Sequence, residues 1–408
     1  MSEIKEQAEK RFKLRTSSLR AYTMIAALAV IWVFFHYATA QSTPAFSDFG
    51  AHIGSFFSFN WIGDGIFLSS RNLSNLMLQT SVTGIIAVGM LMVIVSGNID
   101  LSVGSVLGLA GGAAAIFLTN WGYGLVPAIA AAIAVGVIIN VFQGALIAYA
   151  NIPAFIVTLG GLLAWRGAVK GITKSETVPI ADETFKTIGQ SYIPSEVGWI
   201  LAAAAILFIL AVAVRRAQTQ KSFGLGEPNY GAEVLKSILP IGAIVLFIYV
   251  MNSYAGIPIP VLILLAVALI GVFITNFTTF GRYLYAIGGN ADAARLSGIN
   301  TKVNILKVYA LLGAFTGIAA LIFTARVGSA SPDAGTLKEL DAIAACVIGG
   351  ASLMGGRGTI FGACLGALIM ASLDNGMSLL NVKDFMQDII KGSILVAAVG
   401  LDMVGRKN

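Results

Sequence analysis

The chain of 408 residues is strongly apolar: 57% of its residues are hydrophobic, 11% are charged, and its mean hydropathy is +0.85. Soluble domains carry about 25% charged residues because their surfaces face water, so the composition excludes a soluble protein and predicts an integral membrane protein. The net charge of +6 indicates no nucleic-acid partner, because the basic residues lie in loops beside apolar segments, where a cytoplasmic bias of Lys and Arg explains them.

Apolar segments long enough to cross a bilayer recur along the whole chain. A spanning helix needs about 20 mainly apolar residues, and the 46 glycines suit close helix packing in lipid. We therefore predict an all-α polytopic bundle of about ten spans with broken or re-entrant helices. The predicted spans are 21–40, 73–96, 125–149, 153–169, 199–214, 238–254, 260–280, 305–324 and 389–401, with further apolar segments at 101–118 and 342–372.

The ends of the chain predict its orientation. Residues 1–20 are polar and basic and read as a cytoplasmic tail, followed by a transmembrane domain over 21–405 and a short cytoplasmic tail at 406–408. Ala38-Thr39-Ala40 resembles a signal-peptidase site, but the long preceding tail favours an uncleaved first helix. Threading the spans alternately places both termini and most Lys and Arg residues inside, and leaves 41–70 as a long outer loop.

Two segments interrupt the apolar pattern with glycines and polar residues, at 97–105 and 349–358. Paired interruptions of this kind indicate a translocation pathway, although the first also fits a simple cytoplasmic turn. Residues 342–354 would form a helix of about 20 Å, too short to cross alone. Whether 342–372 crosses twice or re-enters stays open, and with it the choice between ten and about twelve spans.

A short polar segment near the middle of the chain, 281–303, predicts a surface helix between two spans. Asn290 is a suitable N-cap for a helix over 291–296, and Gly298 can end it in a left-handed conformation. The helix would present Asp292 and Arg295 to a partner protein. The alternative is a solvated connector.

Several motifs resemble one family of transport proteins. Residues 290–299 resemble the cytoplasmic coupling loop of ABC importer permeases, and 99–105, 151–160, 340–350 and 373–378 resemble motifs of the ribose/xylose/galactose permease family. The last motif, Leu-Asp-Asn-Gly-Met-Ser, is most similar to D-xylose and multiple-sugar permeases. The long outer loop and the irregular stretch 215–233 depart from the family pattern.

The resemblance implies a monosaccharide permease that is not itself an enzyme. No phosphate-binding loop motif occurs in the sequence, so ATP hydrolysis would belong to a separate ATP-binding cassette subunit. The other implied partners are an extracytoplasmic sugar-binding protein, a second copy of the chain, a monosaccharide and membrane lipid, in the bacterial inner membrane and without cofactor or metal. Alternatives are import of branched-chain amino acids or nucleosides, and ion-coupled secondary transport.

Two sets of residues are expected to carry this function. The contacts with the ATP-binding subunit are predicted at Gly288, Asn290, Ala293, Ala294, Arg295, Ser297, Gly298 and Ile299. A path for neutral, hydroxyl-rich sugars needs hydrogen-bonding groups, for which the candidates are Asn98, Asp100, Ser102, Ser105, Thr158, Asn375 and Ser378.

Charged residues at membrane depth need an explanation, and for the carboxylates there are two. Asp100 either caps a helix that begins at Leu101 or takes part in the path. Glu339, Asp341 and Asp374 are expected to hydrate helix ends near the outer face, with orientation of loops toward the binding protein as the alternative. Arg166 is expected to snorkel toward the outer surface.

Overall fold

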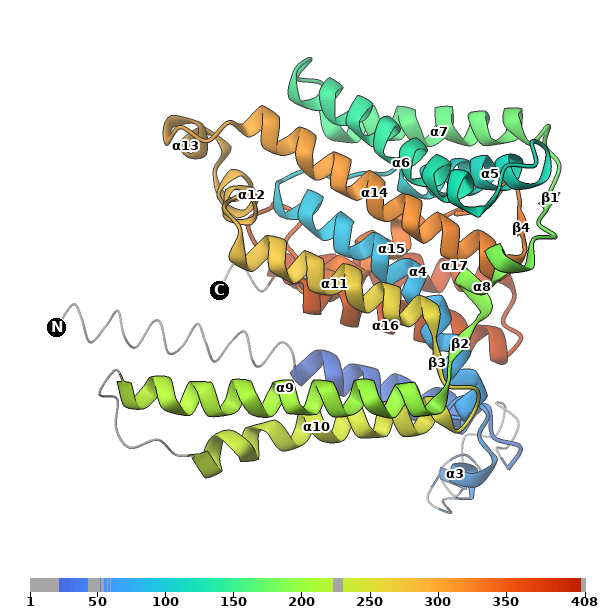
Figure 1. Cartoon of the computed structure of the whole chain (residues 1–408), viewed down its shortest axis with the longest axis vertical. Helices are drawn as coiled ribbons and strands as arrows, with labels where there is room; N and C mark the ends of the chain where they lie inside the picture. Colours follow the sequence, from blue (N-terminus) through green and yellow to red (C-terminus); the bar gives the residue numbers. More distant parts are fainter. Residues whose placement is uncertain are drawn as a thin grey trace.

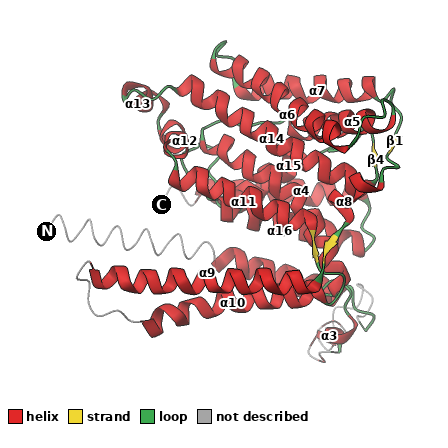
Figure 2. Cartoon of the chain, in the orientation of Figure 1, coloured by secondary structure: helices red, strands yellow, loops and turns green. Residues whose placement is uncertain are grey.

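The structure is a computed structural model that describes residues 22–42, 52, 55–56, 58, 60–222 and 230–404. The predicted tails at 1–20 and 406–408 lie outside the described residues. Most of the described chain is helical (Figure 2). This confirms the predicted all-α membrane architecture.

Most of the long helices run along one common direction (Figure 1). Eight of the described helices are long and apolar enough to span a membrane. They are, in chain order, α4 (Ser70–Val95), α6 (Leu125–Ala148), α7 (Ala154–Ile172), α9 (Ser195–Ser222), α10 (Tyr230–Asn252), α11 (Ile259–Phe277), α14 (Thr301–Val327) and α16 (Ile360–Leu379).

Further helices complete the bundle. An apolar helix covers Tyr22–Ala38, and α17 (Asp384–Val404) ends the described chain. The remaining helices are α3 (Trp61–Asp64), α5 (Val103–Thr119), α8 (Glu183–Gln190), α12 (Thr279–Gly289), α13 (Ala291–Leu296) and α15 (Lys338–Ile348). In the stretch 215–233, which departs from the family pattern, the residues as far as Ser222 belong to α9 and those from Tyr230 onward to α10.

Helix α4 forms the centre of the molecule. Of its most apolar window, 94% is buried, and it packs against α14, α16, α11 and α15. Helix α14 in turn packs against α6, where backbones approach so closely that a Cβ on Gly136 would meet the carbonyl oxygen of Gly313, and the reverse holds as well. Such small-residue contacts replace the hydrophobic effect as the source of helix association in lipid.

The two ends of the bundle differ. At one end, called here the α13 end, lie α12, α13 and the connections after α4 and α15 (Figure 1). At the other, the α8 end, two short antiparallel ribbons tie helix ends together: β1 (Val178–Pro179) with β4 (Ser329–Ala330), and β2 (Tyr192–Ile193) with β3 (Ile257–Pro258).

The first interruption predicted from sequence is an extended segment that returns into the bundle. Gly97 has φ +83 and lies against Gly288 at the α13 end. Gly104, seven residues later, lies against the start of α15, because a Cβ there would meet Glu339 and Gly335. Helix α15 has 11 residues, about 16 Å, and leads back to the α13 end. The non-helical segment 97–102 therefore runs inward from the α13 end over about the length of α15. Helix α5 begins near the middle of the bundle.

The second interruption predicted from sequence, at 349–358, lies in the loop between α15 and α16, and another non-helical segment, 331–337, precedes α15. The chain leaves β4, passes through 331–337, forms α15, and reaches the α13 end in the loop 349–359 before α16 begins. Gly335 and Leu337 adopt left-handed conformations, with φ +75 and +63. The segment 342–372 thus divides into a short helix and a full-length helix with a turn at the α13 end.

Candidate functional site

The segment between α11 and α14 has the local structure that the sequence predicts. Helix α13 covers Ala291–Leu296, and the Asn290 side chain accepts a hydrogen bond from the Ala293 N–H at 2.9 Å. Gly298 follows in the left-handed conformation, with φ +83. The prediction of a capped helix ended by glycine is confirmed.

Helix α12 anchors this segment to the centre of the bundle. A Cβ on Gly288 would meet the carbonyl oxygen of Val95, the last residue of α4, and would lie 2.7 Å from the Gly356 nitrogen. The Tyr285 hydroxyl donates to the Gly358 carbonyl at 2.7 Å, and burial raises the pKa of Tyr285. Helix α12 therefore contacts the ends of both interruptions.

Helix α13 projects from this anchor. Ala294 is buried, whereas most of its neighbours are exposed, and Asp292 and Arg295 pair with each other at 3.2 Å. Leu296 is 86% exposed, which is unusual for a leucine outside the lipid-facing helices. Leu296 is not among the contacts predicted from the sequence; its position beside the C-cap of a predicted surface helix is the signal that could have found it.

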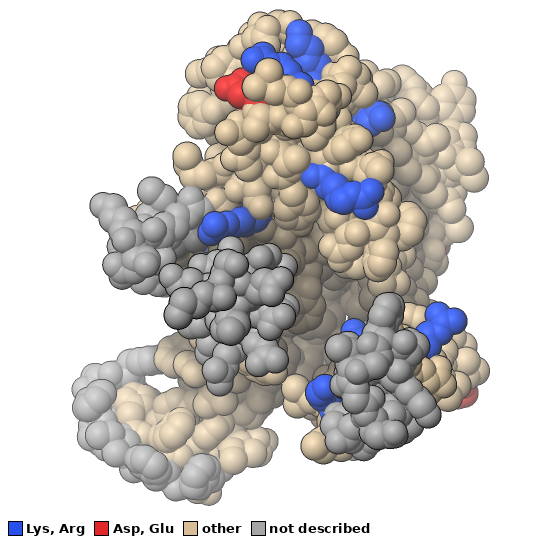
Figure 3. All heavy atoms as spheres, turned by 90° about the vertical axis from the view of Figure 1, so that its left-hand side faces the viewer, with Lys and Arg blue, Asp and Glu red and all other residues tan. Residues whose placement is uncertain are grey.

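The α13 end is basic. Figure 3 views this end and shows Lys and Arg side chains on several elements, with few acidic ones. Exposed basic residues come from α9, α12, α13, α14 and the loop before α16: Arg215, Arg216, Arg282, Arg295, Lys302, Lys307 and Arg357.

Four of the predicted path residues gather around the start of α5. Asp100 Oδ1 accepts from the Ser102 N–H and hydroxyl, each at 2.7 Å, and the Ser102 hydroxyl also lies 2.9 Å from Gln143 Oε1. The Thr158 hydroxyl donates to backbone carbonyls of α7, and the Ser105 hydroxyl to the Leu162 carbonyl at 2.8 Å.

These groups are buried and hold the interruption in place. Asp100, Ser102, Ser105 and Thr158 are all fully buried. The helix begins at Val103 with Ser102 as N-cap, two residues later than the start at Leu101 that the sequence suggested. The Asp100 carboxylate still lies at this positive helix end, where it is electrostatically favourable. Asn98 lies nearer the α13 end, where its amide contacts Ser96.

Arg166, which is expected to extend toward the outer surface, is half-buried and contacts the segment 331–337. Its guanidinium donates to the carbonyl oxygens of Ala334 at 2.7 Å and Pro332 at 3.3 Å. The reason is that the non-helical segment 331–337 leaves carbonyl groups without helical partners, and at membrane depth such groups need donors from the protein. Arg166 supplies them.

The two remaining path candidates, Asn375 and Ser378, lie on α16, away from α5. Asn375 Oδ1 accepts from Asn72 Nδ2 at 2.8 Å in a buried contact with α4. Ser378 lines a cavity of about 280 Å³. The structure therefore brings Asp100, Ser102, Ser105 and Thr158 together and separates them from the α16 pair.

This cavity, called here the polar cavity, lies between α4, α14, α15, α16 and α17 toward the α8 end. Polar side chains from all five helices converge on it, and of these only Ser378 was predicted from the sequence as a path residue. Its polar lining consists of Gln79, Thr83, Arg326, Lys338, Asp374, Ser378, Gln387 and Lys391.

An ion-pair network lies against the polar cavity. Lys391 Nζ lies 3.3 Å from Asp374 Oδ1 and 3.6 Å from Asp341 Oδ1, and Lys338 Nζ lies 2.7 Å from Asp341 Oδ2. Asp341 and Glu339 are buried, so the expectation that these carboxylates hydrate helix ends is wrong. Their positions inside the bundle follow from the inward course of 331–337.

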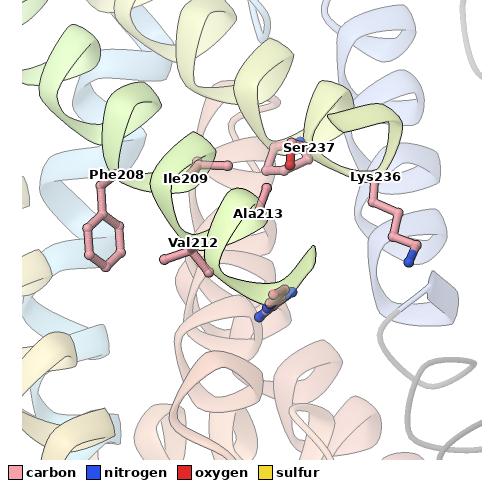
Figure 4. Close-up of a pocket in the computed structure, with 8 residues that line it drawn as sticks. Phe208, Ile209, Val212, Ala213, Lys236 and Ser237 are labelled. Carbon is pink, nitrogen blue, oxygen red and sulfur yellow. The ribbon is translucent and has the colours of Figure 1, made fainter. Parts of the chain in front are cut away.

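A second groove, of about 200 Å³, lies between α9 and α10. Phe208, Ile209, Val212 and Ala213 of α9 form much of its wall, with Lys236 and Ser237 of α10 opposite (Figure 4). This largely apolar groove offers few partners for a hydroxyl-rich solute. Within the described ranges, no three His, Cys, Asp or Glu side chains are arranged to hold a metal ion.

Residues 72–399 match a family described as the permease component of branched-chain amino acid transport systems. The chain is 46% identical to the xylose transport system permease protein of Haemophilus influenzae, over 97% of this chain and 99% of the relative. It is 43% identical to the corresponding Escherichia coli K12 protein, over 97% and 94%.

A more distant relative is the ribose import permease protein of Escherichia coli K12, 37% identical over 82% of this chain and 87% of the relative. No solved structure matches the chain.

Proposed function

Because the chain belongs to the family of transport-system permease components, we propose that it is the membrane subunit of an ATP-driven importer for a monosaccharide, with D-xylose the first candidate. The observation that carries this proposal is the similarity to xylose permeases over nearly the full length of both chains. Ribose is the second candidate, because a ribose permease aligns over most of the chain. The relatives thus favour a sugar over a branched-chain amino acid.

We propose that the α13 end faces the cytoplasm and docks on a separate ATP-binding subunit. The basic side chains there support this orientation, since Lys and Arg concentrate on the cytoplasmic side of membrane proteins (Figure 3). Exposed Leu296 and the Asp292–Arg295 pair on α13 provide one apolar and two charged contacts. ATP hydrolysis belongs to that partner, and a sugar-binding protein delivers substrate at the α8 end.

The mechanism proposed is alternating access in an assembly with two copies of the chain. Movement of the ATP-binding subunits displaces α13 and, through it, α12. Because Gly288 touches Val95, Gly97 and Gly356, this displacement reaches the end of α4 and both interruptions. Non-helical segments absorb such motion more readily than intact helices, as in other discontinuous transporter helices.

The predicted path residues receive different roles in this proposal. Ser378 lines the path on the α8 side. Asp100, Ser102, Ser105 and Thr158 hold the first interruption in shape, and Asn98 joins it to the α13 end. Asn375 fixes α16 to α4 through Asn72.

Substitution of Gly298 tests the docking role. Gly298→Val places a β-branched residue at φ +83 with open space around it, so α13 should lose its geometry while the bundle stays folded. In vesicles with the ATP-binding and sugar-binding proteins, we expect xylose uptake to fall at least tenfold, with sugar-stimulated ATP hydrolysis no longer linked to uptake.

Gly122→Val is the matched control. Gly122 lies just after the end of α5, has φ +67, and has no atom within 4 Å of the position that a Cβ would take. It should keep uptake near that of the unsubstituted protein. Normal uptake and ATP hydrolysis in Gly298→Val would refute docking at α13. If ATP depletion does not change xylose or ribose uptake by the unsubstituted protein, the assignment as an ATP-driven importer is refuted.

A further inference from the structure

We propose that the polar cavity is a binding site for the transported sugar within a single copy of the chain. This inference rests on the proposed function and assigns its substrate contacts. Part of the cavity is formed by α4, which runs through the centre of the molecule, and the opposite wall by α16 and α17.

Ionisable side chains border the polar cavity well inside the helix ends. Asp374 lies five residues before the end of α16 and Lys391 seven residues after the start of α17, so both lie about 8–10 Å inside the helix ends. Charged side chains within membrane helices are costly, face the bundle or a watery cavity, and mark substrate pathways. Their position against a cavity of about 280 Å³ fits such a pathway.

Most of the charge at the cavity wall is paired. Lys338 pairs with Asp341 and Lys391 with Asp374, and the third cation of the lining, Arg326, donates to the Asn75 amide oxygen. Two of the three cations are thus neutralised by carboxylates beside them, so the wall offers hydrogen bonds to a neutral solute.

Hydrogen-bond donors and acceptors lie side by side in the polar cavity. Lysine and arginine donate hydrogen bonds, carboxylates accept them, and glutamine amides and hydroxyls do both. The side chains of Gln79, Thr83 and Ser378 add such groups on two walls. Neighbouring donors and acceptors match the adjacent hydroxyl groups of a sugar ring, each of which donates and accepts.

The apolar lining completes the match. Val82, Phe323 and Ala371 face the cavity among the polar groups. Ligand sites combine an apolar wall with a few placed polar groups, and the C–H face of a pyranose supplies the complementary apolar surface. The polar cavity therefore offers both kinds of contact, whereas the α9–α10 groove offers mainly the apolar kind.

Chemical protection tests direct binding. In a protein with Cys346 and Cys364 replaced by alanine, Ser378→Cys should react with a membrane-impermeant maleimide in detergent. D-xylose alone should slow this reaction at least threefold, and glycerol at equal concentration should not. Thr177→Cys, exposed beside β1, should react at a rate that xylose does not change.

The second test uses substitutions that leave the ion pairs intact. Thr83→Val and Gln79→Leu remove polar groups from the cavity wall at nearly constant shape. We expect each to raise the KM for xylose uptake at least threefold, or to change the preference between xylose and ribose by that factor, with binding-protein-stimulated ATP hydrolysis retained. Thr80→Val is the matched control, because the Thr80 hydroxyl is bonded to the Leu76 carbonyl of its own helix.

The two proposals fail in different ways. The maleimide experiment needs no ATP-binding subunit, so protection by xylose would support the site even if uptake proved independent of ATP. Equal labelling rates with and without xylose, together with unchanged KM and sugar preference in both variants of an actively transporting protein, would overturn the site and leave the importer assignment standing.

Discussion

Some residues in this protein act by leaving room for a neighbouring backbone or by donating hydrogen bonds to backbone carbonyl groups within the membrane. Gly288 leaves room for the carbonyl oxygen of Val95, and Arg166 donates to two carbonyl groups of the segment 331–337. Both residues support non-helical backbone, which water cannot solvate inside a bilayer. Their importance comes from the interruptions they support.

The Gly288 contact can be tested with two neighbouring glycines. Gly288→Ala places a Cβ against backbone atoms of Val95 and Gly356, which cannot move aside as a side-chain end would. Overpacking of this kind costs about 1–3 kcal/mol, so the midpoint of thermal unfolding in detergent should fall.

Gly289→Ala is the control, since no atom of another element lies within 4 Å of the position that its Cβ would take. Its unfolding midpoint should stay within about a degree of the unsubstituted protein, because surface changes away from contacts have small effects. Equal midpoints for the two variants would contradict the close packing of α12 on α4.

At the scale of elements, α13 is too short to form on its own. It has six residues, and isolated helices of fewer than about 12 residues are marginal in water. Its stability rests on the Asn290 cap, the Gly298 turn and the buried Ala294. Helix α14 has the same kind of cap at Asn300, but its length and packing stabilise it independently.

Removal of the two caps should therefore have different results. Asn290→Ala should raise hydrogen exchange of amides 291–296 by about fivefold, since loss of an N-cap costs about 1 kcal/mol, and xylose uptake should fall. Asn300→Ala loses the bond to the Val303 N–H, yet exchange beyond the first turn of α14 should not change. Unchanged exchange over 291–296 would show that docking on the bundle alone orders α13.

At the scale of the whole molecule, the proposed function requires the α13 end and the α8 end to face opposite sides of the membrane. The basic side chains at the α13 end (Figure 3) support a cytoplasmic position for it. The polar cavity then lies toward the side from which the sugar arrives.

Labelling in intact cells tests this orientation. In a background without native cysteines, Thr177→Cys at the α8 end should react with an impermeant maleimide in intact cells. Ser297→Cys, exposed after α13, should react only after the cells are permeabilised. The reverse pattern would refute docking of α13 on a cytoplasmic ATP-binding subunit.

The sequence by itself determined the elements whose causes are local. Apolar segments of about 20 residues predicted the spans, and Asn290 with Gly298 predicted α13 and its ends, because capping depends on residues within one turn. The motifs also led to the transport family that the comparisons confirm. Gly97 and Gly350 marked the places where regular helix is interrupted.

Tertiary structure alone decided how those interruptions are used and what surrounds the polar cavity. Arg166 meets Ala334, and Lys391 meets Asp341 and Asp374, across separations in the chain that no local pattern records. A charged residue in an apolar sequence shows only that a partner or a cavity must exist. Which one it has depends on the packing of the helices against each other, and that packing is set by contacts among residues from the whole chain.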